Sequence, residues 1–231
     1  MKYNLHDSWS DFFLQHNDEI VQIISKIDIE NSTPKMSDIF NFTEIDKNKI
    51  KVVILGQDPY PQKNTATGRC FEAGTLKNWN EPFKQISLKN IIRLVYCSCI
   101  DKNQNPYNIS FNCIREFINN GTIKIKRPDE IFKYWQNQGV LLLNTALSCE
   151  INNSFSHAAL WKNFTNDLIK YINNNEKIIW FLWGTHAISY QTVINGKIYA
   201  SNHPMMCSKK NENDFLKNKC FSETTEIINW I

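Results

Sequence analysis

An aliphatic run passes abruptly into a polar turn in Lys51-Val52-Val53-Ile54-Leu55-Gly56-Gln57-Asp58-Pro59-Tyr60. The β-branched side chains of Val52, Val53 and Ile54 predict a short buried strand over residues 51–55, and Gly56 and Pro59 predict that it ends in a turn. Asp58 therefore follows the carboxyl end of a buried strand. A rigidly held carboxylate in that position suits catalysis, although a lone Asp there more often caps the next turn.

The same order of strand, loop and helix recurs along the chain. Aliphatic runs predict three more strands, at residues 140–143, 177–182 and 197–200. Apolar residues at helical spacing predict helices at 128–138, at 155–172 and through Ile91, Ile92 and Val95. This alternation indicates an α/β fold, a three-layer α/β/α sandwich around a central, mostly parallel four-stranded sheet. Such sheets bind ligands at the carboxyl ends of their strands, where Asp58, Asn144 and His203 fall.

The length of 231 residues favours one well-buried core, so we expect a single domain over residues 1–231. Its first fifty residues are expected to form an amino-terminal helical part, because the stretch from Leu5 to Ile27 reads as one amphipathic helix. Residues 102–126 are polar and irregular, which predicts a surface insertion and a candidate region for partner specificity.

The composition narrows the possible classes of protein. No apolar run approaches the roughly 20 residues of a membrane-spanning helix, and no signal pattern opens the chain, so we expect no membrane and a cytoplasmic location, or wherever the host genome is replicated. Seven cysteines without a CxxC pair or zinc spacing argue against a disulfide framework or a structural metal. The net charge is only +3, so a phosphate-binding face has to come from local placement of Lys and Arg.

Four separated motifs carry a family resemblance. Gly56-Gln57-Asp58-Pro59-Tyr60 resembles the water-activating loop of family-1 uracil-DNA glycosylases. Three further segments are similar to the family in the same order, namely Gly68-Arg69-Cys70-Phe71, Leu141-Leu142-Leu143-Asn144-Thr145 with Ser156-His157 after it, and His203-Pro204. In addition, Leu182-Trp183-Gly184-Thr185-His186-Ala187 looks like the family's penultimate strand and its phosphate-contacting loop. The resemblance implies a DNA-repair hydrolase that flips uracil out of DNA and hydrolyses its N-glycosidic bond, with no cofactor and no metal.

The resemblance assigns the catalytic work to two residues. Asp58 would orient the attacking water and offset the cationic sugar, and His203, as neutral imidazole, would donate a hydrogen bond to uracil O2. Taken alone, a His at a strand end is more often satisfied by backbone groups.

The resemblance builds the uracil-binding pocket from four residues. Phe71 would stack on the flipped ring, Asn144 would pair with uracil O4 and N3–H, Tyr60 would exclude the 5-methyl group of thymine, and Gln57 would complete the pocket. The plainer interpretations are a core position for Phe71 and a turn or cap for Asn144.

A further group of residues would contact the DNA backbone. Ser87, Thr185 and Ser208 match hydroxyl positions that grip phosphates, although Ser87 also suits a helix cap, and His157 is expected to be structural or phosphate-side. The residue that fills the space left by the flipped base falls at Cys207, after Met205-Met206. Cys207 is short for this task and a methionine is long enough, so Met205 or Met206 is a second candidate.

The sequence departs from the family in two places. Pro61 stands where the family usually has His after the Tyr, and the proline-rich loop is reduced to Glu81-Pro82-Phe83. With a proline after the Tyr, the sequence resembles viral glycosylases that also act as replication-processivity subunits.

The expected partners are single- and double-stranded DNA containing uracil, and inhibitor proteins that mimic DNA, with a monomeric chain. Two alternatives remain open at the level of sequence. One is a DNA-binding or processivity scaffold with weakened catalysis. The other is an enzyme that accepts other damaged bases.

Overall fold

The computed structural model describes residues 5–173 and 176–231; residues 1–4 of the predicted amino-terminal part lie outside the described residues. Four parallel strands form the central sheet in the order β3-β2-β5-β6. They are β2 (Val52–Gly56), β3 (Val140–Asn144), β5 (Ile179–Trp183) and β6 (Ile198–Ser201). A separate antiparallel ribbon pairs β1 (Ser32–Thr33) with β4 (Cys149–Glu150). The predicted four-stranded parallel sheet is confirmed.

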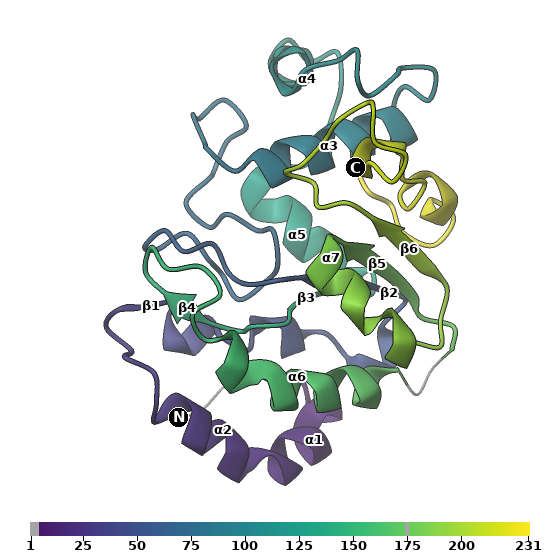
Figure 1. The fold of residues 1–231 in the computed structure, drawn as a ribbon. Coiled ribbons are helices and arrows are strands. Elements are labelled where there is room, and N and C mark those ends of the chain that lie inside the picture. Colours follow the sequence, from purple (N-terminus) through teal and green to yellow (C-terminus); the bar gives the residue numbers. More distant parts are fainter. Residues whose placement is uncertain (1–4, 174–175) are drawn as a thin grey trace.

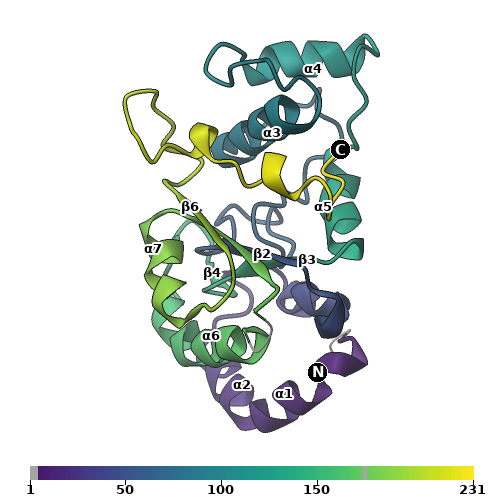
Figure 2. The same ribbon diagram turned by 90° about the vertical axis from the view of Figure 1, so that its right-hand side faces the viewer.

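Helices cover both faces of this sheet (Figure 1). One face carries α3 (Ile86–Cys99) and α5 (Pro128–Asn137), and the other carries α6 (Ala158–Ile172), α1 (Ser10–Gln15) and α2 (Asn17–Ile24). The view turned by 90° shows the sheet between these two layers (Figure 2). The predicted three-layer α/β/α sandwich is therefore confirmed.

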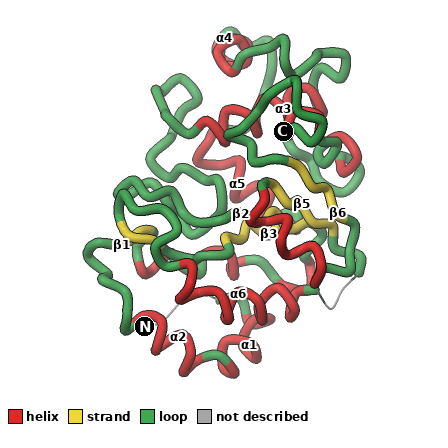
Figure 3. The backbone as a smooth tube through the Cα atoms, viewed as in Figure 1, coloured by secondary structure: helices red, strands yellow, loops and turns green. Residues whose placement is uncertain are grey.

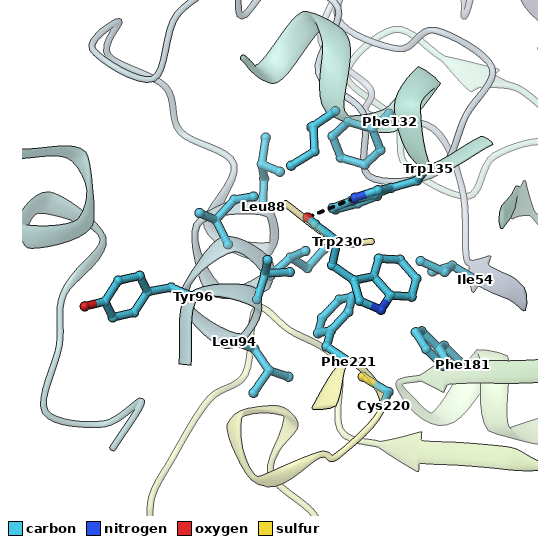
Figure 4. Close-up of a cluster of buried hydrophobic side chains, with 14 of the residues drawn as sticks. Ile54, Leu88, Leu94, Tyr96, Phe132, Trp135, Phe181, Cys220, Phe221 and Trp230 are labelled. Atoms are coloured by element: carbon cyan, nitrogen blue, oxygen red, sulfur yellow. Dashed lines mark hydrogen bonds between the residues drawn. The ribbon is translucent and has the colours of Figure 1, made fainter. Parts of the chain in front are cut away.

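The strands read as continuous aliphatic runs because both faces of the sheet are buried. Ile54 and Phe181 belong to the core beneath α3 and α5, whereas their neighbours Leu55 and Leu182 belong to the core beneath α6. Figure 4 shows the α3–α5 core, in which the indole N–H of Trp135 donates to the Trp230 carbonyl at 3.1 Å. The carboxyl-terminal segment thus closes this core.

Short 3₁₀ turns and loops make up much of the remaining chain (Figure 3). The 3₁₀ turns span Asp7–Trp9, Met36–Asp38, Asn41–Glu44, Lys47–Lys49, Ser189–Val193, Phe215–Lys217 and Ser222–Thr224. Two helices remain, α4 (Phe111–Asn119) and the single turn α7 (Thr185–Ile188) after β5. Within residues 5–173 and 176–231, every helix is too short or too polar to cross a lipid bilayer.

The single helix predicted over residues 5–27 is wrong in detail, since the chain forms α1 and α2 with an interruption at His16. His16 has φ −101° and ψ 10°, outside the helical range, and its ring lies 4.3 Å from that of Phe12. Its backbone N–H still bonds to the Phe12 carbonyl at 3.1 Å, and the Ile20 N–H bonds to the His16 carbonyl at 2.9 Å. The apolar spacing continues across the break, so periodicity alone does not reveal it.

The prediction that residues 102–126 are irregular is also wrong, because α4 lies within them. Ser110 caps this helix, its hydroxyl accepting a hydrogen bond from the Cys113 N–H at 3.2 Å. Phe111 and Ile114 are buried, and α4 packs outermost against α3 (Figure 1). A helix this short that buries so few side chains leaves a weak pattern in sequence.

Candidate active site

A cavity of about 490 Å³ opens at the carboxyl ends of the strands. All six residues predicted to be catalytic or to bind uracil line it, namely Gln57, Asp58, Tyr60, Phe71, Asn144 and His203. The strand order places β2 beside β5. The helix after β2, α3, packs in the core on one face of the sheet, and Ala187 of α7, which follows β5, packs in the core on the other. The crevice at such a point is where open α/β sheets bind ligands. We call this hollow the strand-end cavity.

Backbone hydrogen bonds join the loops after β2 and β3. The hydroxyl of Thr145 donates to the Gln57 carbonyl at 2.8 Å, and the Ala146 N–H donates to the same oxygen at 2.9 Å. Gly56 is required at the end of β2, because a Cβ there would lie 2.3 Å from Asn144 Oδ1. The two loops therefore form one rigid floor for the cavity.

Asn144 is 3% exposed, yet its side-chain amide forms no hydrogen bond with any residue that the structure describes. Its oxygen and nitrogen are not among the fully enclosed polar atoms that lack a partner, and the residue lines the cavity, so the amide is accessible from the cavity. An N–H donor and a carbonyl acceptor are thus left available, side by side, to a ligand in the cavity.

Asp58 has a fixed orientation. Its Oδ2 accepts a hydrogen bond from the backbone N–H of Phe155 at 2.7 Å. Burial raises the pKa of this carboxyl above its usual value of 3.8, and the hydrogen bond from Phe155 acts in the opposite direction. Phe155 itself has φ 65°, a left-handed backbone conformation that costs about 1–3 kcal/mol in a bulky residue. A strained turn therefore delivers the N–H that aims the carboxylate.

His203 lies in the first turn after β6 as a neutral imidazole. The backbone N–H of Met205 donates to its Nδ1 at 3.2 Å, so Nδ1 is the unprotonated nitrogen and Nε2 carries the hydrogen. Burial lowers the pKa of His203 below 6.5, which also favours the neutral form. Gly184, with φ 99°, lets the loop after β5 approach, because a Cβ there would lie 3.1 Å from that of His203.

Phe71 presents a ring to the cavity from a strained backbone. Its φ is 62°, and its ring centroid lies 5.5 Å from that of Trp183 and 5.9 Å from that of His203. The hydroxyl of Tyr60 donates to the Phe71 carbonyl at 3.3 Å, and burial raises the pKa of Tyr60. An aromatic ring, an unpaired amide, a carboxylate and a neutral imidazole thus share one cavity.

Comparison with known proteins agrees with this geometry. The family model described as the uracil DNA glycosylase superfamily matches residues 42–228. The chain belongs to the uracil-DNA glycosylase superfamily. Curated relatives named uracil-DNA glycosylase include those of Clostridium perfringens, 32% identical with 89% of this chain and 81% of the relative covered, and Campylobacter jejuni subsp. doylei, 31% identical with 98% and 90% covered.

Solved structures give the same family. A mimivirus uracil-DNA glycosylase variant in complex with UGI is 28% identical, with a TM-score of 0.66 over 87% of this chain and 70% of that one. The enzyme from Nitratifractor salsuginis shares the fold at 20% identity, with a TM-score of 0.74 over 96% of this chain and 90% of that one.

In this glycosylase the Phe71 turn rests on a charge cluster that sequence reasoning missed. The Arg69 side chain is 11% exposed and pairs with Glu44 at 2.7 Å and Glu72 at 3.1 Å, while its Nε donates to Gln136 at 2.5 Å. Lys133 also pairs with Glu44. We call these five residues the Arg69 cluster. The one signal in the sequence was a basic residue inside an otherwise apolar motif.

Glu44 comes from the amino-terminal part of the chain, for which the sequence predicted a helical part and no role in the site. The same region meets the turn again at Gly68, where a Cβ would lie 1.8 Å from the Asp38 carbonyl, and at Thr67, whose carbonyl accepts from the Asn41 amide at 2.8 Å. The first fifty residues therefore position one wall of the active site.

Of the three hydroxyl residues predicted to contact the DNA backbone, only Ser87 lines the strand-end cavity. Ser87 lines the cavity in the first turn of α3, where it is buried, and Gln85 rather than Ser87 is the N-cap. Thr185 and Ser208 are exposed outside the cavity. These two hydroxyls are open to solvent beside the strand ends.

The two candidates for the intercalating residue differ in exposure. The thiol of Cys207 donates to the Pro204 carbonyl at 3.2 Å and is partly buried, whereas Met205 is 53% exposed and Met206 is 64% exposed. The large apolar side chains at this loop are therefore the two methionines.

The remaining motif residues have structural contacts. His157 is buried and its Nδ1 lies 2.9 Å from the Ser148 hydroxyl, so the structural interpretation of this residue fits. The Pro61 carbonyl accepts from the Asn152 N–H at 2.9 Å, which ties this departure from the family into the loop near Asp58. No three His, Cys, Asp or Glu side chains gather as a metal site within the described ranges.

Proposed function

We propose that the protein excises uracil from DNA by hydrolysing the N-glycosidic bond, leaving an abasic site and free uracil. One observation carries this proposal: the unpaired amide of Asn144 lies in the same cavity as the Phe71 ring, the Asp58 carboxylate and the neutral His203. A buried donor and acceptor side by side match the O4 and N3–H edge of uracil, whereas cytosine presents the reverse pattern.

Selection of uracil over thymine would depend on Tyr60. Its hydroxyl bonds to the Phe71 carbonyl, so the ring is held in place beside the surface on which the flipped base would stack. A fixed ring edge excludes a 5-methyl group by steric contact. Gln57 supports this pocket through its carbonyl, which ties together the loops after β2 and β3.

The chemistry follows from the two groups that flank the base. As the C1′–N1 bond breaks, its electron pair moves to the uracil ring, and Nε2–H of His203 donates to the developing negative charge on O2. The Asp58 carboxylate offsets the positive charge on the sugar and orients a water molecule. The water oxygen forms the new bond to C1′ as its O–H bond breaks and the proton passes to the Asp58 carboxylate, and uracil leaves as an anion that takes its proton from solvent.

The substrate would be uracil-containing DNA, single- or double-stranded, bound by a monomer in the cytoplasm or wherever the host genome is replicated. The mimivirus relative was solved in complex with UGI. We extend this to the present chain and expect a DNA-mimicking inhibitor to cover the strand-end cavity.

The decisive experiment measures uracil release from a labelled single-stranded oligonucleotide in EDTA, beside matched oligonucleotides with thymine or cytosine at the same position. Release from uracil alone is the expected result. Release of thymine would contradict the role of Tyr60, and DNA binding without any release would favour a scaffold protein on the same fold.

A further inference from the structure

A second hollow adjoins the strand-end cavity. It is an open groove of about 490 Å³ between α3 and the start of α4. Its α3 wall includes Ile86, Lys89 and Arg93, and its other wall carries the exposed amides Asn108 and Asn112. Ile86 lines both hollows, so the α3–α4 groove continues the cavity along α3.

Positive charge is concentrated in the chain segment that contains this groove, and two of its basic residues, Lys89 and Arg93, line the groove. Residues 84–126 contain seven basic and two acidic side chains, an excess of five positive charges, although the whole chain has a net charge of only +3. The rest of the chain is therefore negative on balance. This is the local placement of Lys and Arg that a phosphate-binding face requires in a nearly neutral protein.

The two cations in the groove are not neutralised by carboxylates. Arg93 donates to the carbonyls of Pro106 and Ile109 and to Asn90 Oδ1, at 2.5, 2.9 and 2.7 Å, and all three acceptors are uncharged. Lys89 lies 4.9 Å from the centroid of the Phe83 ring. Neither side chain forms an ion pair within residues 5–173 and 176–231.

We propose that the α3–α4 groove binds the phosphate backbone of the strand that carries the uracil, two to three nucleotides from the flipped base. Arg93 lies seven residues beyond Ile86 on α3, or roughly 10 Å along the helix at 1.5 Å per residue. Stacked DNA advances about 3.4 Å per nucleotide on each strand, so this length spans two to three nucleotides. The inference deepens the proposed function and rests on it.

The groove is preformed, which lowers the cost of binding. The hydrogen bonds from Arg93 fix the chain before α4, and Phe111 and Ile114 anchor α4 on α3. Asn108 and Asn112 then offer amide groups to phosphate or sugar oxygens. Residues 102–126 thereby form a second wall for the DNA strand.

Two variants of the groove test this inference. Lys89→Gln removes one positive charge, and Asn112→Asp adds a negative charge in the first turn of α4, where an acidic side chain favours the helix. Lys124→Gln is the matched control, because Lys124 is exposed in the same segment but lies outside the groove. The substrates are a 15-nucleotide single strand and a trinucleotide with uracil at its centre, which is too short to reach the groove.

Both groove variants should lower kcat/KM on the 15-mer by about 3- to 10-fold at low salt, with kcat unchanged. Neither should alter kcat/KM on the trinucleotide. Lys89→Gln should also reduce the slope of log affinity against log salt by about 0.7, the value for one phosphate contact on a single strand. Lys124→Gln should change each quantity by less than about twofold.

Equal losses on both substrates, or no loss on the 15-mer, would overturn the groove while leaving the glycosylase assignment intact. If the wild-type protein released no uracil at all, the proposed function would fail first. Fluorescence anisotropy with the same 15-mer then decides the groove alone: weaker binding by Lys89→Gln but not by Lys124→Gln supports it, and equal binding rejects it.

Discussion

Phe71 and His203 are far apart in the sequence but line the same cavity, and the fold holds them by different means. The Phe71 turn rests on the buried Arg69 cluster and on the amino-terminal part of the chain. The loop with His203 is attached to α3 by a hydrogen bond in which the Asn90 amide donates to the Pro204 carbonyl at 2.6 Å. The stacking surface is thus built to be rigid, whereas the imidazole lies on a loop that also exposes two methionines.

The buried carboxyl of Asp214 provides a further tie for that second loop. It accepts hydrogen bonds from the Ser208 N–H, the Leu216 N–H and the Tyr107 hydroxyl at 2.5, 3.0 and 2.5 Å. Tyr107 belongs to residues 102–126, so the groove wall and the His203 loop are physically connected. A rigidly held Phe71 suits stacking on the face of the flipped base, and the tethered loop that carries His203 and the methionines suits insertion into distorted DNA.

The largest expected effect comes from Asp58, in the loop after β2 that lies between the Phe71 turn and the His203 loop. Asp58→Asn should reduce kcat by about 100- to 10,000-fold, because the carboxylate no longer orients water or offsets the sugar charge. Binding of uracil-containing DNA should be retained, as anisotropy would show. Wild-type rates in this variant would contradict the role of Asp58.

The same variant has a predicted effect on stability. Burial raises the pKa of Asp58, so the favourable contribution of this carboxyl is present below pH 3.8 and is lost as the pH rises through the raised pKa. Asp58→Asn should therefore be more stable than wild type to urea at pH 7, and the difference should shrink towards about pH 3.

Breaking the Arg69 cluster tests the rigid support of the Phe71 turn. Arg69→Ala leaves Glu44 and Glu72 without their common partner and should lower the free energy of unfolding by about 3–5 kcal/mol, measured by urea denaturation. Lys170→Ala is the control, because its pair with Asp167 is exposed and should be worth about 0.2–1 kcal/mol. Similar losses in the two variants would show that the cluster is not a special support.

The pH dependence of kcat/KM tests the role of the loop that carries His203. Protonation of His203 would place a hydrogen on Nδ1 against the Met205 N–H, so the loop should be disturbed at acid pH. Burial lowers the pKa of His203 from 6.5, so the neutral form of this imidazole persists to a lower pH than usual. We expect kcat/KM to be flat above about pH 6.5 and to fall below it. Loss of activity as the pH rises from about 6.5 to 8 would contradict the neutral imidazole.

Removing the hydrogen bond between Asn90 and the His203 loop should have a moderate effect on kcat/KM. Asn90→Ala removes the bond to the Pro204 carbonyl and also the oxygen that accepts from Arg93. Loss of the bond to Pro204, at about 1–1.5 kcal/mol, corresponds to roughly a tenfold fall in kcat/KM, and Asn90→Asp, which keeps the acceptor for Arg93, is the matched variant. A positioning role predicts that the acid limb of the pH profile shifts as well, because His203 lies in this loop. A purely structural role would lower stability without moving the limb.

The smallest effect concerns the exposed methionines. Met206→Ala should reduce excision from duplex DNA by about 3- to 10-fold and leave excision from single strands within about twofold, since only a duplex has a gap to fill. Cys207→Ala should change neither, because its thiol faces the Pro204 carbonyl. The opposite ranking would return the intercalating role to Cys207.

The sequence predicted the residues at the strand ends, but it did not predict the Arg69 cluster that supports the Phe71 turn. Asp58, Asn144 and His203 were found because each follows an aliphatic run, and strand ends in a parallel sheet converge at one edge. Arg69 was quoted only as part of a motif, since its partners Glu44 and Gln136 lie 25 and 67 residues away. No local pattern links residues at such separations.

Local chemistry is what the sequence by itself determined: alternating strands and helices, the turn after β2, and the residue types at the strand ends. Periodicity and turn preference involve neighbours in the chain, so they are visible without a structure. Only the tertiary structure decided the strand order, the unpaired amide of Asn144, the tautomer of His203 and the groove beside α4. Each of these depends on groups brought together by folding, and burial then sets their hydrogen bonds and charge.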